Sequence, residues 1–265
     1  MNDLVSIIMP SYNCGRFVEE SIHSVQAQTY QNWEIIVVDD CSSDDSVRRI
    51  KKLQLEDSRI RLFQNSDNSG AAISRNNALR EARGRWIAFL DSDDLWMPTK
   101  LEEQIDFMVK HKYAFSYTNY VEIDEKSIAT GVHVSGPSHI AKAGMYAFCW
   151  PGCLTVMYDR NTIGLIQIED IKKNNDYAMW LKVCKMADCY LLDRCLAKYR
   201  RGRSGSISNN SHFTMIKWHY KLFRCAEGMN PILSTLMTCL NLVCGVFKKV
   251  WYVKKMKTSV RIVTN

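Results

Sequence analysis

Short apolar runs alternate along the N-terminal part of the chain with stretches in which apolar residues recur every third or fourth position. Runs of the first kind predict buried strands, and spacing of the second kind predicts helices. The predicted strands are residues 4–10, 34–38, 60–65 and 86–90. The predicted helices are residues 16–28, a stretch capped by Ser42 or Ser43, and a stretch within 68–84 that follows a loop and ends at Gly84. This alternation predicts an α/β fold, with a mostly parallel central sheet flanked by helices.

The pattern after Pro98 is less regular. Residues 99–112 have helical spacing, residues 114–123 predict a further strand, and residues 148–158 predict a Trp-Pro-Gly turn followed by another strand. Residues 124–144 have mixed polarity and predict a hairpin or a loop. With 265 residues, of which 46% are hydrophobic, the chain suits one large domain or one domain with an appendage.

Carboxylates follow two of the predicted strands directly, at the point where each strand ends. The second and fourth strands lead into Asp39, Asp40, Asp91, Asp93 and Asp94. Ligands of a parallel α/β sheet bind beyond the carboxyl ends of its strands. These side chains are therefore expected to share one pocket with the turn that begins at Pro10.

The aspartates after the fourth strand favour a metal site. Crowded like charges are costly unless a cation lies among them, and hard divalent cations prefer carboxylate and phosphate oxygens. The alternative is a polar loop in which Asp91 caps the helix that begins near Pro98. No glycine-rich phosphate loop of the GxxxxGK or GxGxxG type follows a predicted strand. A nucleotide or phosphate is therefore expected to bind through carboxylates and a metal.

The net charge of +7 is distributed unevenly. Residues 212–265 hold nine Lys or Arg against one Glu, whereas the remainder holds 26 basic and 27 acidic residues. The basic tail therefore favours an anionic partner for the tail rather than for the whole surface. The ten cysteines are scattered, without a CxxC motif or a signal peptide, which indicates reduced thiols in a cytosolic protein.

The tail also has a composition suited to a membrane surface. Residues 230–247 are apolar but include polar side chains, and their length is marginal for crossing a bilayer. Residues 248–257 mix aromatic residues with lysines, as in the headgroup zone. We expect peripheral attachment to the cytoplasmic face of the inner membrane. The alternative is a pair of helices packed on the main domain with a solvated basic face.

Five motifs together resemble family 2 inverting glycosyltransferases of the GT-A fold. They are SIIMPSYN (6–13), SVQAQTYQNWEIIVVDDCSSD (24–44), NSGAAISRNNAL (68–79), FLDSDDLWMPTKLE (89–102) and NDYAMWLK (175–182). They cover most of residues 4–205 in the order and spacing of the family. The subgroup that the chain resembles extends a sugar on a diphosphate-linked lipid during O-antigen synthesis in enteric bacteria.

The resemblance implies a role for each matching residue on the nucleotide side. Pro10, Tyr12 and Asp40 match positions that receive the uracil base, with Asp39 nearby. Arg75 is similar to the basic residue that approaches the diphosphate.

For the metal and the acceptor, the resemblance implies further roles. Asp91, Ser92 and Asp93 match the DxD motif, which holds Mn²⁺ or Mg²⁺ against the diphosphate, with Asp94 as a second candidate ligand. Asp176 matches the general base that takes the proton of the acceptor hydroxyl. From the residues alone, without the resemblance, the simpler interpretation of Asp176 is a cap of the helix that follows it.

The segment at 199–208 resembles a loop that closes over the nucleotide. Many relatives have a histidine there, whereas this chain has Arg200, Arg201 and Arg203. We expect one of these arginines, with Arg200 and Arg203 as the named candidates, to contact the diphosphate. The resemblance also implies a division of the chain. The expected parts are a catalytic domain at 1–210, with a nucleotide-binding half (1–98) and an acceptor-binding half (99–210), and a basic membrane-associating segment at 211–265.

The expected reaction is inverting transfer of a sugar from a UDP-sugar to a GlcNAc- or GalNAc-diphosphate lipid. Glucose and a β1,3 linkage are preferred on subgroup resemblance, and UDP-galactose or a UDP-N-acetylhexosamine in capsule or exopolysaccharide synthesis is the alternative. A two-metal nucleotidyltransferase is another candidate enzyme. A non-catalytic nucleotide- or nucleic-acid-binding module fits the basic tail. However, a neutral body with an acidic sheet edge disfavours a polyanion, so no nucleic acid partner is expected.

Overall fold

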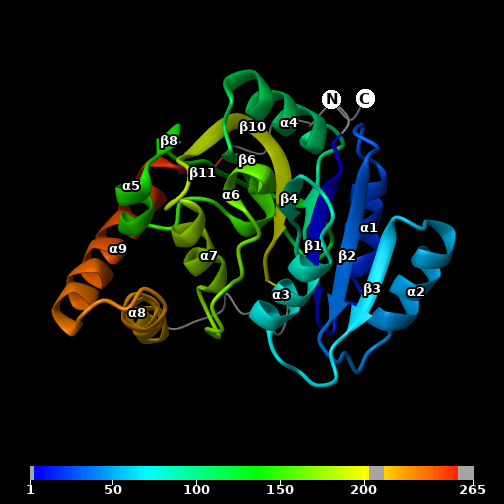
Figure 1. Ribbon diagram of the computed structural model, residues 1–265, viewed down its shortest axis with the longest axis horizontal. Helices are drawn as coiled ribbons and strands as arrows, with labels where there is room; N and C mark the ends of the chain where they lie inside the picture. The colour runs from blue at the N-terminus through cyan, green and yellow to red at the C-terminus, as the bar shows by residue number, and fades with distance from the viewer. Residues whose placement is uncertain (1–2, 203–211, 256–265) are drawn as a thin grey trace.

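One continuous sheet of 11 strands runs through the computed structural model, which describes residues 3–202 and 212–255 (Figure 1). The main path of the sheet is β11-β7-β6-β9-β4-β1-β2-β3, and β10 pairs with β5, β6 and β8. The strands are β1 (Val5–Ser11), β2 (Trp33–Asp39), β3 (Ile60–Gln64), β4 (Trp86–Phe89), β5 (Leu95–Trp96), β6 (Phe115–Ile123), β7 (Ala129–Val134), β8 (His139–Ile140), β9 (Met157–Asp159), β10 (Cys189–Arg200) and β11 (Val253–Lys255).

The N-terminal half of the sheet is parallel, as the alternation of strands and helices predicts. The central strand β1 pairs in parallel with β2 and β4, and β2 pairs in parallel with β3. Nearly every residue of β1, β2 and β4 is buried because helices cover both faces. On one face Ile7 packs in a cluster with apolar residues of α1 (Val18–Gln26), α2 (Ser46–Glu56) and α4 (Lys100–His111). On the other, Ile8 packs with residues of α3 (Ala71–Glu81) and α7 (Asn175–Val183).

Two predicted helix caps are wrong. Helix α2 begins at Ser46, so neither Ser42 nor Ser43 caps it, and Ser42 instead hydrogen-bonds Asp39. Helix α4 begins at Lys100 after Thr99, so Asp91 does not cap it. Asp91 lies farther back in the loop after β4 and is available for another role.

The second half of the sheet has mixed strand directions. Strand β9 pairs antiparallel with both β4 and β6, and β6 and β7 form an antiparallel pair, which is the hairpin alternative for residues 124–144. The long strand β10 runs parallel to β6 and ends at Arg200. The remaining helical elements are α5 (Lys142–Ala147), η1 (Cys153–Thr155) and α6 (Arg160–Ile163).

The last elements join the same body. They are α8 (His212–Lys221), a π-helical turn η2 (Leu222–Ala226), α9 (Pro231–Trp251) and β11. Strand β11 pairs antiparallel with β7, which places Val253 opposite Val134. Leu222 and Phe223 are fully buried in the core cluster around α7. The described part of the basic tail therefore contributes both a strand and core residues to the main domain, with α9 and α2 at opposite ends of the molecule (Figure 1).

Candidate active site

A cavity of about 670 Å³ opens beyond the carboxyl ends of β1, β2 and β4. Nine of the expected site residues line it: Pro10, Tyr12, Asp40, Arg75, Asp91, Ser92, Asp93, Asp176 and Arg200. Met215 and His219 of α8 also line it, although no motif in the sequence pointed to them. Asp39 and Asp94 do not line this cavity, and Arg203 lies outside the described residues.

Asp40 organises the loop that leads into α3. Its carboxylate accepts hydrogen bonds from Asn65 Nδ2 at 2.8 Å, Ser69 N at 2.9 Å and Gly70 N at 2.8 Å. Gly70 has a φ of 88°, a conformation that glycine adopts without steric cost. Asp40 therefore shapes one wall of the cavity through the backbone of this loop.

Asp39 lies behind the cavity wall. It is fully buried, and its carboxylate accepts hydrogen bonds from Ser42 N at 2.9 Å and Ser42 Oγ at 2.6 Å. These bonds hold a turn in which Cys41 has a φ of 63°. In this structure Asp39 supports the loop next to the expected nucleotide site and does not reach the cavity.

Arg75 of α3 connects the loop after β4, which carries Asp91, Asp93 and Asp94, to α7. Its Nη2 lies 2.6 Å from Asp91 Oδ1, and its Nη1 donates to Asn175 Oδ1 at 2.7 Å. Burial alone would lower the pKa of Arg75, but the negative charge of Asp91, with a contribution from Asp176, raises it above its ordinary value. Arg75 is therefore a buried cation that joins the loop after β4 to the start of α7. Asn175, which sequence reasoning missed, adjoins Asp176 in the NDYAMWLK motif.

The three aspartates after β4 do not converge on one point. Asp91 and Asp93 line the cavity, whereas Asp94 is buried and its Oδ1 accepts a hydrogen bond from Arg200 N at 2.7 Å. Burial, followed by the charges of Asp93 and Asp91, raises the pKa of Asp94 well above its ordinary value. The expectation that Asp94 is a metal ligand is therefore corrected: its carboxylate is turned away from the cavity toward the end of β10.

The donor set fits a metal that binds together with a substrate. Within residues 3–202 and 212–255, no group of three or more His, Cys, Asp or Glu side chains is arranged to hold a metal ion. Mg²⁺ in phosphate-handling sites is commonly held by one or two carboxylates plus substrate phosphate oxygens. Asp91 and Asp93 can supply that number from one side of the cavity.

Asp176 lies in the first turn of α7 and lines the cavity. Helix α7 begins at Asn175 with Asn174 at the N-cap position, so the alternative in which Asp176 is the cap is wrong. Its Oδ1 accepts a hydrogen bond from Tyr177 N at 2.8 Å. Burial raises the pKa of Asp176, and the charge of Arg75 opposes this increase. A cavity-lining carboxylate with a raised pKa is suited to accepting a proton.

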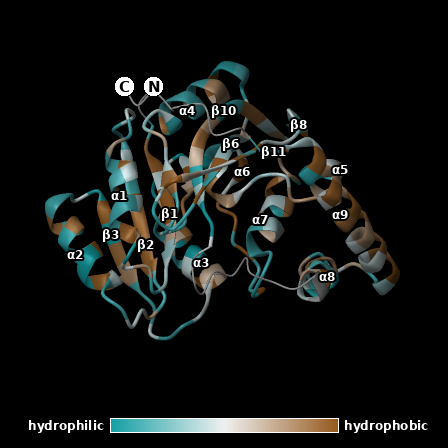
Figure 2. Cartoon of the chain, turned by 180° about the vertical axis from the view of Figure 1, so that it is seen from behind, coloured by the Kyte–Doolittle hydropathy of each residue, from teal (hydrophilic) through white to brown (hydrophobic). Residues whose placement is uncertain are grey.

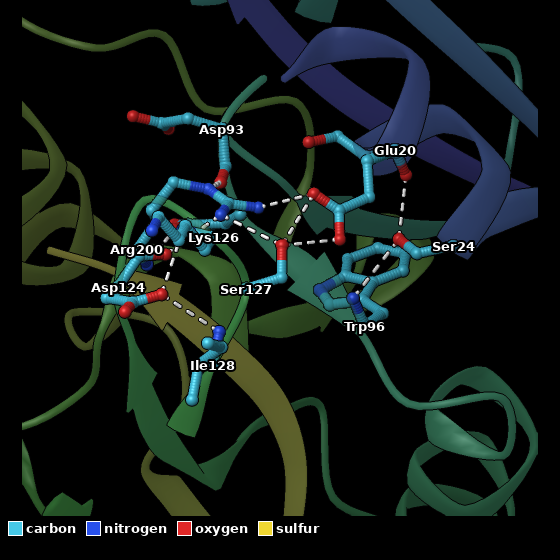
Figure 3. Close-up of polar contacts among 11 residues, drawn as sticks. Glu20, Ser24, Asp93, Trp96, Asp124, Lys126, Ser127, Ile128 and Arg200 are labelled. Carbon is cyan, nitrogen blue, oxygen red and sulfur yellow. Dashed lines mark hydrogen bonds and ion pairs between the residues drawn. The ribbon is translucent and has the colours of Figure 1, made fainter. Parts of the chain in front are cut away.

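Arg200 lies at the centre of a network of hydrogen bonds that joins the loop after β4, α1 and the turn after β6 (Figure 3). Its Nε donates to Asp93 O at 2.7 Å, and its Nη1 donates to Asp124 O and Ser127 Oγ, both at 3.0 Å. Its Nη2 lies 2.7 Å from Glu20 Oε2. The side chain is fully buried. All three guanidinium nitrogens are therefore engaged by the protein.

This network disfavours the expected contact of Arg200 with a diphosphate, although Arg200 lines the cavity. The engaged guanidinium also stacks on the Phe17 ring at 4.6 Å, so it cannot leave without breaking several contacts. Arg201 pairs with Glu122 at 2.8 Å, and its side chain is 60% exposed. Of the expected arginines, Arg203 lies outside the described residues. Arg200 instead ties β10 to the loop after β4 and to the turn after β6.

The mixed α/β sheet with its flanking helices is the GT-A fold. Residues 6–147 match the family model described as "Glycosyl transferase family 2". The chain belongs to this family and is a glycosyltransferase, rather than a two-metal nucleotidyltransferase or a non-catalytic module.

Comparison with individual proteins supports this assignment. The chain is 45% identical over 210 residues to WfgD of Escherichia coli, a UDP-Glc:alpha-D-GlcNAc-diphosphoundecaprenol beta-1,3-glucosyltransferase. The aligned region covers 78% of this chain and 80% of WfgD. The crystal structure of Staphylococcus aureus TarS in complex with UDP-GlcNAc has a TM-score of 0.70 and 19% identity, covering 90% of this chain and 71% of that one. The mannosyltransferase PcManGT from Pyrobaculum calidifontis, in complex with GDP-Man and Mn²⁺, has a TM-score of 0.62 and 15% identity, covering 93% and 76%. At these identities the two structures show the fold alone.

Proposed function

We propose that the protein transfers glucose from UDP-glucose, with inversion, to a GlcNAc- or GalNAc-diphosphate lipid, forming a β1,3 linkage in O-antigen synthesis. The observation that carries this proposal is one cavity lined by Asp91 and Asp93 together with Asp176. Such a cavity provides carboxylates for a metal-diphosphate group and a separate carboxylate for an acceptor hydroxyl. The 45% identity to WfgD over most of both chains supports the donor and acceptor.

The residues of the cavity divide the work between leaving group and acceptor. Pro10, Tyr12 and Asp40 form the wall expected to receive uracil, and Ser92 with Asp91 and Asp93 faces the diphosphate. Mn²⁺ or Mg²⁺, held by Asp91 and Asp93, would neutralise charge on the departing UDP. Asp176 takes the acceptor proton at Oδ2, because Oδ1 already accepts from Tyr177 N. The acceptor oxygen attacks the anomeric carbon from the face opposite UDP.

In this proposal Arg75 acts through its neighbours. It was expected at the diphosphate, but its guanidinium is 2.6 Å from Asp91 and 2.7 Å from Asn175. It therefore orients Asp91 and the start of α7. Its positive charge also opposes the rise in the pKa of Asp176, which keeps a larger fraction of that carboxylate ionised.

A donor panel tests the proposed reaction. Purified protein is supplied with Mn²⁺, a synthetic GlcNAc-diphosphate lipid and, in separate reactions, UDP-glucose, UDP-galactose or a UDP-N-acetylhexosamine. We expect a single hexose to be added from UDP-glucose, detected by mass spectrometry, with a β1,3 linkage in linkage analysis. A product from UDP-galactose or a UDP-N-acetylhexosamine alone would move the assignment to those donors. No transfer from any UDP-sugar would overturn the proposal.

Metal removal is expected to abolish transfer. EDTA should lower the rate by roughly 100-fold or more, because neutralisation of the leaving diphosphate contributes several kcal/mol, and added Mn²⁺ or Mg²⁺ should restore it. Asp93→Asn should raise the metal concentration for half-maximal activity at least roughly tenfold. Loss of a residue that only hydrogen-bonds a metal ligand already lowers metal affinity by about that factor, so loss of a ligand should lower it by at least as much. The matched control is Asp94→Asn, which keeps an acceptor for Arg200 N and should leave the metal requirement unchanged. An equal shift in both variants would contradict the assignment of ligands.

We also propose that the protein works at the cytoplasmic face of the inner membrane and attaches peripherally. In this division of the chain, residues 1–98 and 99–210 provide the donor and acceptor halves, and 211–265 form the membrane-associating segment. The support is the excess of Lys and Arg in that segment and the lipid-linked acceptor of WfgD. Because Met215 and His219 of α8 line the cavity, the segment begins at the catalytic centre.

A further inference from the structure

Helix α9 has the reverse polarity of a helix on a water-soluble protein. Its buried residues are Ser234, Thr238 and Asn241, which lie on one face. Asn241 Nδ2 donates to Tyr177 OH at 2.8 Å and to Ala147 O at 3.1 Å. A surface helix in water normally directs its apolar face inward. Here hydrogen-bonding side chains, with Met237 and Cys244 beside them, hold α9 to the domain, whereas most of its large apolar side chains are exposed.

The outward face of α9 is a continuous apolar surface. Six of its side chains are more than 60% exposed: Ile232, Leu236, Val243, Val246, Val250 and Trp251. Figure 2 shows hydrophobic colouring along α9 at the edge of the molecule. Within the described residues, α9 is also the helix long and apolar enough to cross a membrane by length and composition. An apolar surface of this extent requires a non-aqueous partner.

The charges around α9 favour a lipid bilayer as that partner. Residues 231–247 contain no charged side chain. Lys249, Lys254 and Lys255 are exposed at the C-terminal end beside Trp251, whereas Lys248 turns inward and donates to Trp150 O at 2.6 Å. Tryptophan and lysine at the border of an apolar surface suit the headgroup region, where the phosphates are anionic.

Both ends of α9 belong to the same body, so the helix cannot cross a bilayer without unfolding its neighbours. On the N-terminal side, Phe223 is buried in the core. On the C-terminal side, Val253 of β11 pairs with β7. At 21 residues α9 is about 31 Å long, which is enough to span, but a span would separate two ends that the sheet and core hold on one side.

We propose that α9 lies in the plane of the membrane with its apolar face inserted between the acyl chains, so that insertion rather than charge holds the enzyme there. This deepens the proposed function, since it rests on a lipid-linked acceptor for its purpose. Asn241 bonds the side chain of Tyr177, the residue after Asp176. Membrane helix and proposed base are therefore parts of one packed unit, which sets the depth at which the base meets an acceptor anchored in the same bilayer.

Flotation of the full chain with vesicles tests this proposal. Vesicles of neutral phosphatidylcholine and of phosphatidylcholine with phosphatidylglycerol are compared at low salt and at about 0.5 M salt, where exposed charges are screened. We expect the parent to float with both lipids at both salt concentrations. The triple variant Leu236→Asn, Val243→Asn, Val246→Asn should lose roughly tenfold or more of the bound fraction, because its inserted area is reduced.

Two further variants separate insertion from charge and from general surface effects. The matched control, Leu55→Asn, Ile128→Asn, Met186→Asn, changes apolar side chains that are equally exposed elsewhere and should float like the parent. Lys249→Gln, Lys254→Gln, Lys255→Gln should weaken binding to the anionic vesicles only, and only at low salt. Each variant is checked for folding by thermal melting and by transfer to a short-chain acceptor in solution, which needs no membrane.

Three outcomes would overturn the proposal. Parent protein that floats only with anionic vesicles and is released by salt would mean attachment by charge. Absence of flotation together with a dimer in sedimentation, abolished by the triple apolar variant, would mean that a second copy covers α9. In sealed inverted membrane vesicles, protease protection of a C-terminal tag but not of an N-terminal tag would mean a spanning helix. Transfer to the short-chain acceptor reports on the proposed reaction separately from all three.

Discussion

Asp176→Asn is expected to lower kcat for sugar transfer by roughly 10³-fold, within the range for loss of a general base. The asparagine side chain keeps the acceptor for Tyr177 N but cannot take the proton of the acceptor hydroxyl. UDP should still bind with unchanged affinity, because Asp91 and Asp93, on which the diphosphate is expected to depend, are intact. The measurements are product formation by mass spectrometry and UDP titration by calorimetry. The matched control is Asp188→Asn, which changes an exposed carboxylate beyond the other end of α7 and should leave kcat unchanged.

The role of Asp176 as a base also predicts how kcat/KM changes with pH. Burial raises the pKa of Asp176 above its ordinary value of 3.8, even though the charge of Arg75 opposes the increase. A base acts when it is deprotonated, so kcat/KM should be full above the raised pKa and should fall as the pH drops through it. The residual activity of Asp176→Asn should lack this acidic limb. If the pH profile of the variant kept an acidic limb with the same midpoint as that of the parent, the proton transfer would belong to another group.

Arg200→Met is expected to lower the free energy of unfolding by about 3 kcal/mol, at the lower end for breaking a buried ion pair because Glu20 remains half exposed. Methionine keeps much of the volume and the contact with Phe17, but it removes the guanidinium donors to the carbonyl groups of Asp93 and Asp124. The measurement is urea denaturation, with the midpoint and slope compared between variant and parent.

The adjacent arginine provides the control for this prediction. Arg201 is largely exposed and pairs with Glu122, so Arg201→Met should cost less than about 1 kcal/mol. If Arg200→Met were as stable as the parent but bound UDP weakly, Arg200 would be a diphosphate ligand after all. The two variants thus separate a residue that holds the cavity wall from a residue that contacts the substrate.

Local sequence patterns predicted the parallel half of the fold well. Strands β1, β2 and β4 are buried and largely apolar, so they were found close to their observed bounds, and the partly exposed β3 was found as well. The carboxylates were expected at one sheet edge because parallel strands end on the same side. Family motifs then pointed to Asp176 and Arg75, which no spacing rule could have linked across about 100 residues of chain.

Sequence reasoning failed where the outcome depended on the direction of a side chain. Asp93 and Asp94 are neighbours, but only Asp93 lines the cavity, because Asp94 accepts a hydrogen bond from Arg200 N at the end of β10. Asp39 and Asp40 differ in the same way: the carboxylate of Asp39 bonds Ser42 in a buried turn, whereas Asp40 lines the cavity. The direction of such a side chain depends on which hydrogen-bond donor lies beside it in the folded protein. That donor can belong to a strand far away in the sequence, so a local pattern cannot predict it.

The tail illustrates the same distinction. Its composition indicated an apolar stretch with a basic end, but the order of residues did not reveal which face of α9 the domain would cover. Only the packing of Asn241 against Tyr177 shows that the polar face is inside and the apolar face outside.

The sequence by itself determined the strands and helices of the parallel half, the acidic sheet edge and the family, because these follow from short-range periodicity and from contiguous motifs. The tertiary structure decided which carboxylates face the cavity, that Arg75 and Arg200 are held by protein partners, and that α9 is turned apolar side outward. These features depend on contacts between residues far apart in the chain, whose hydrogen bonds and buried charges acquire their energies only when the fold brings them together.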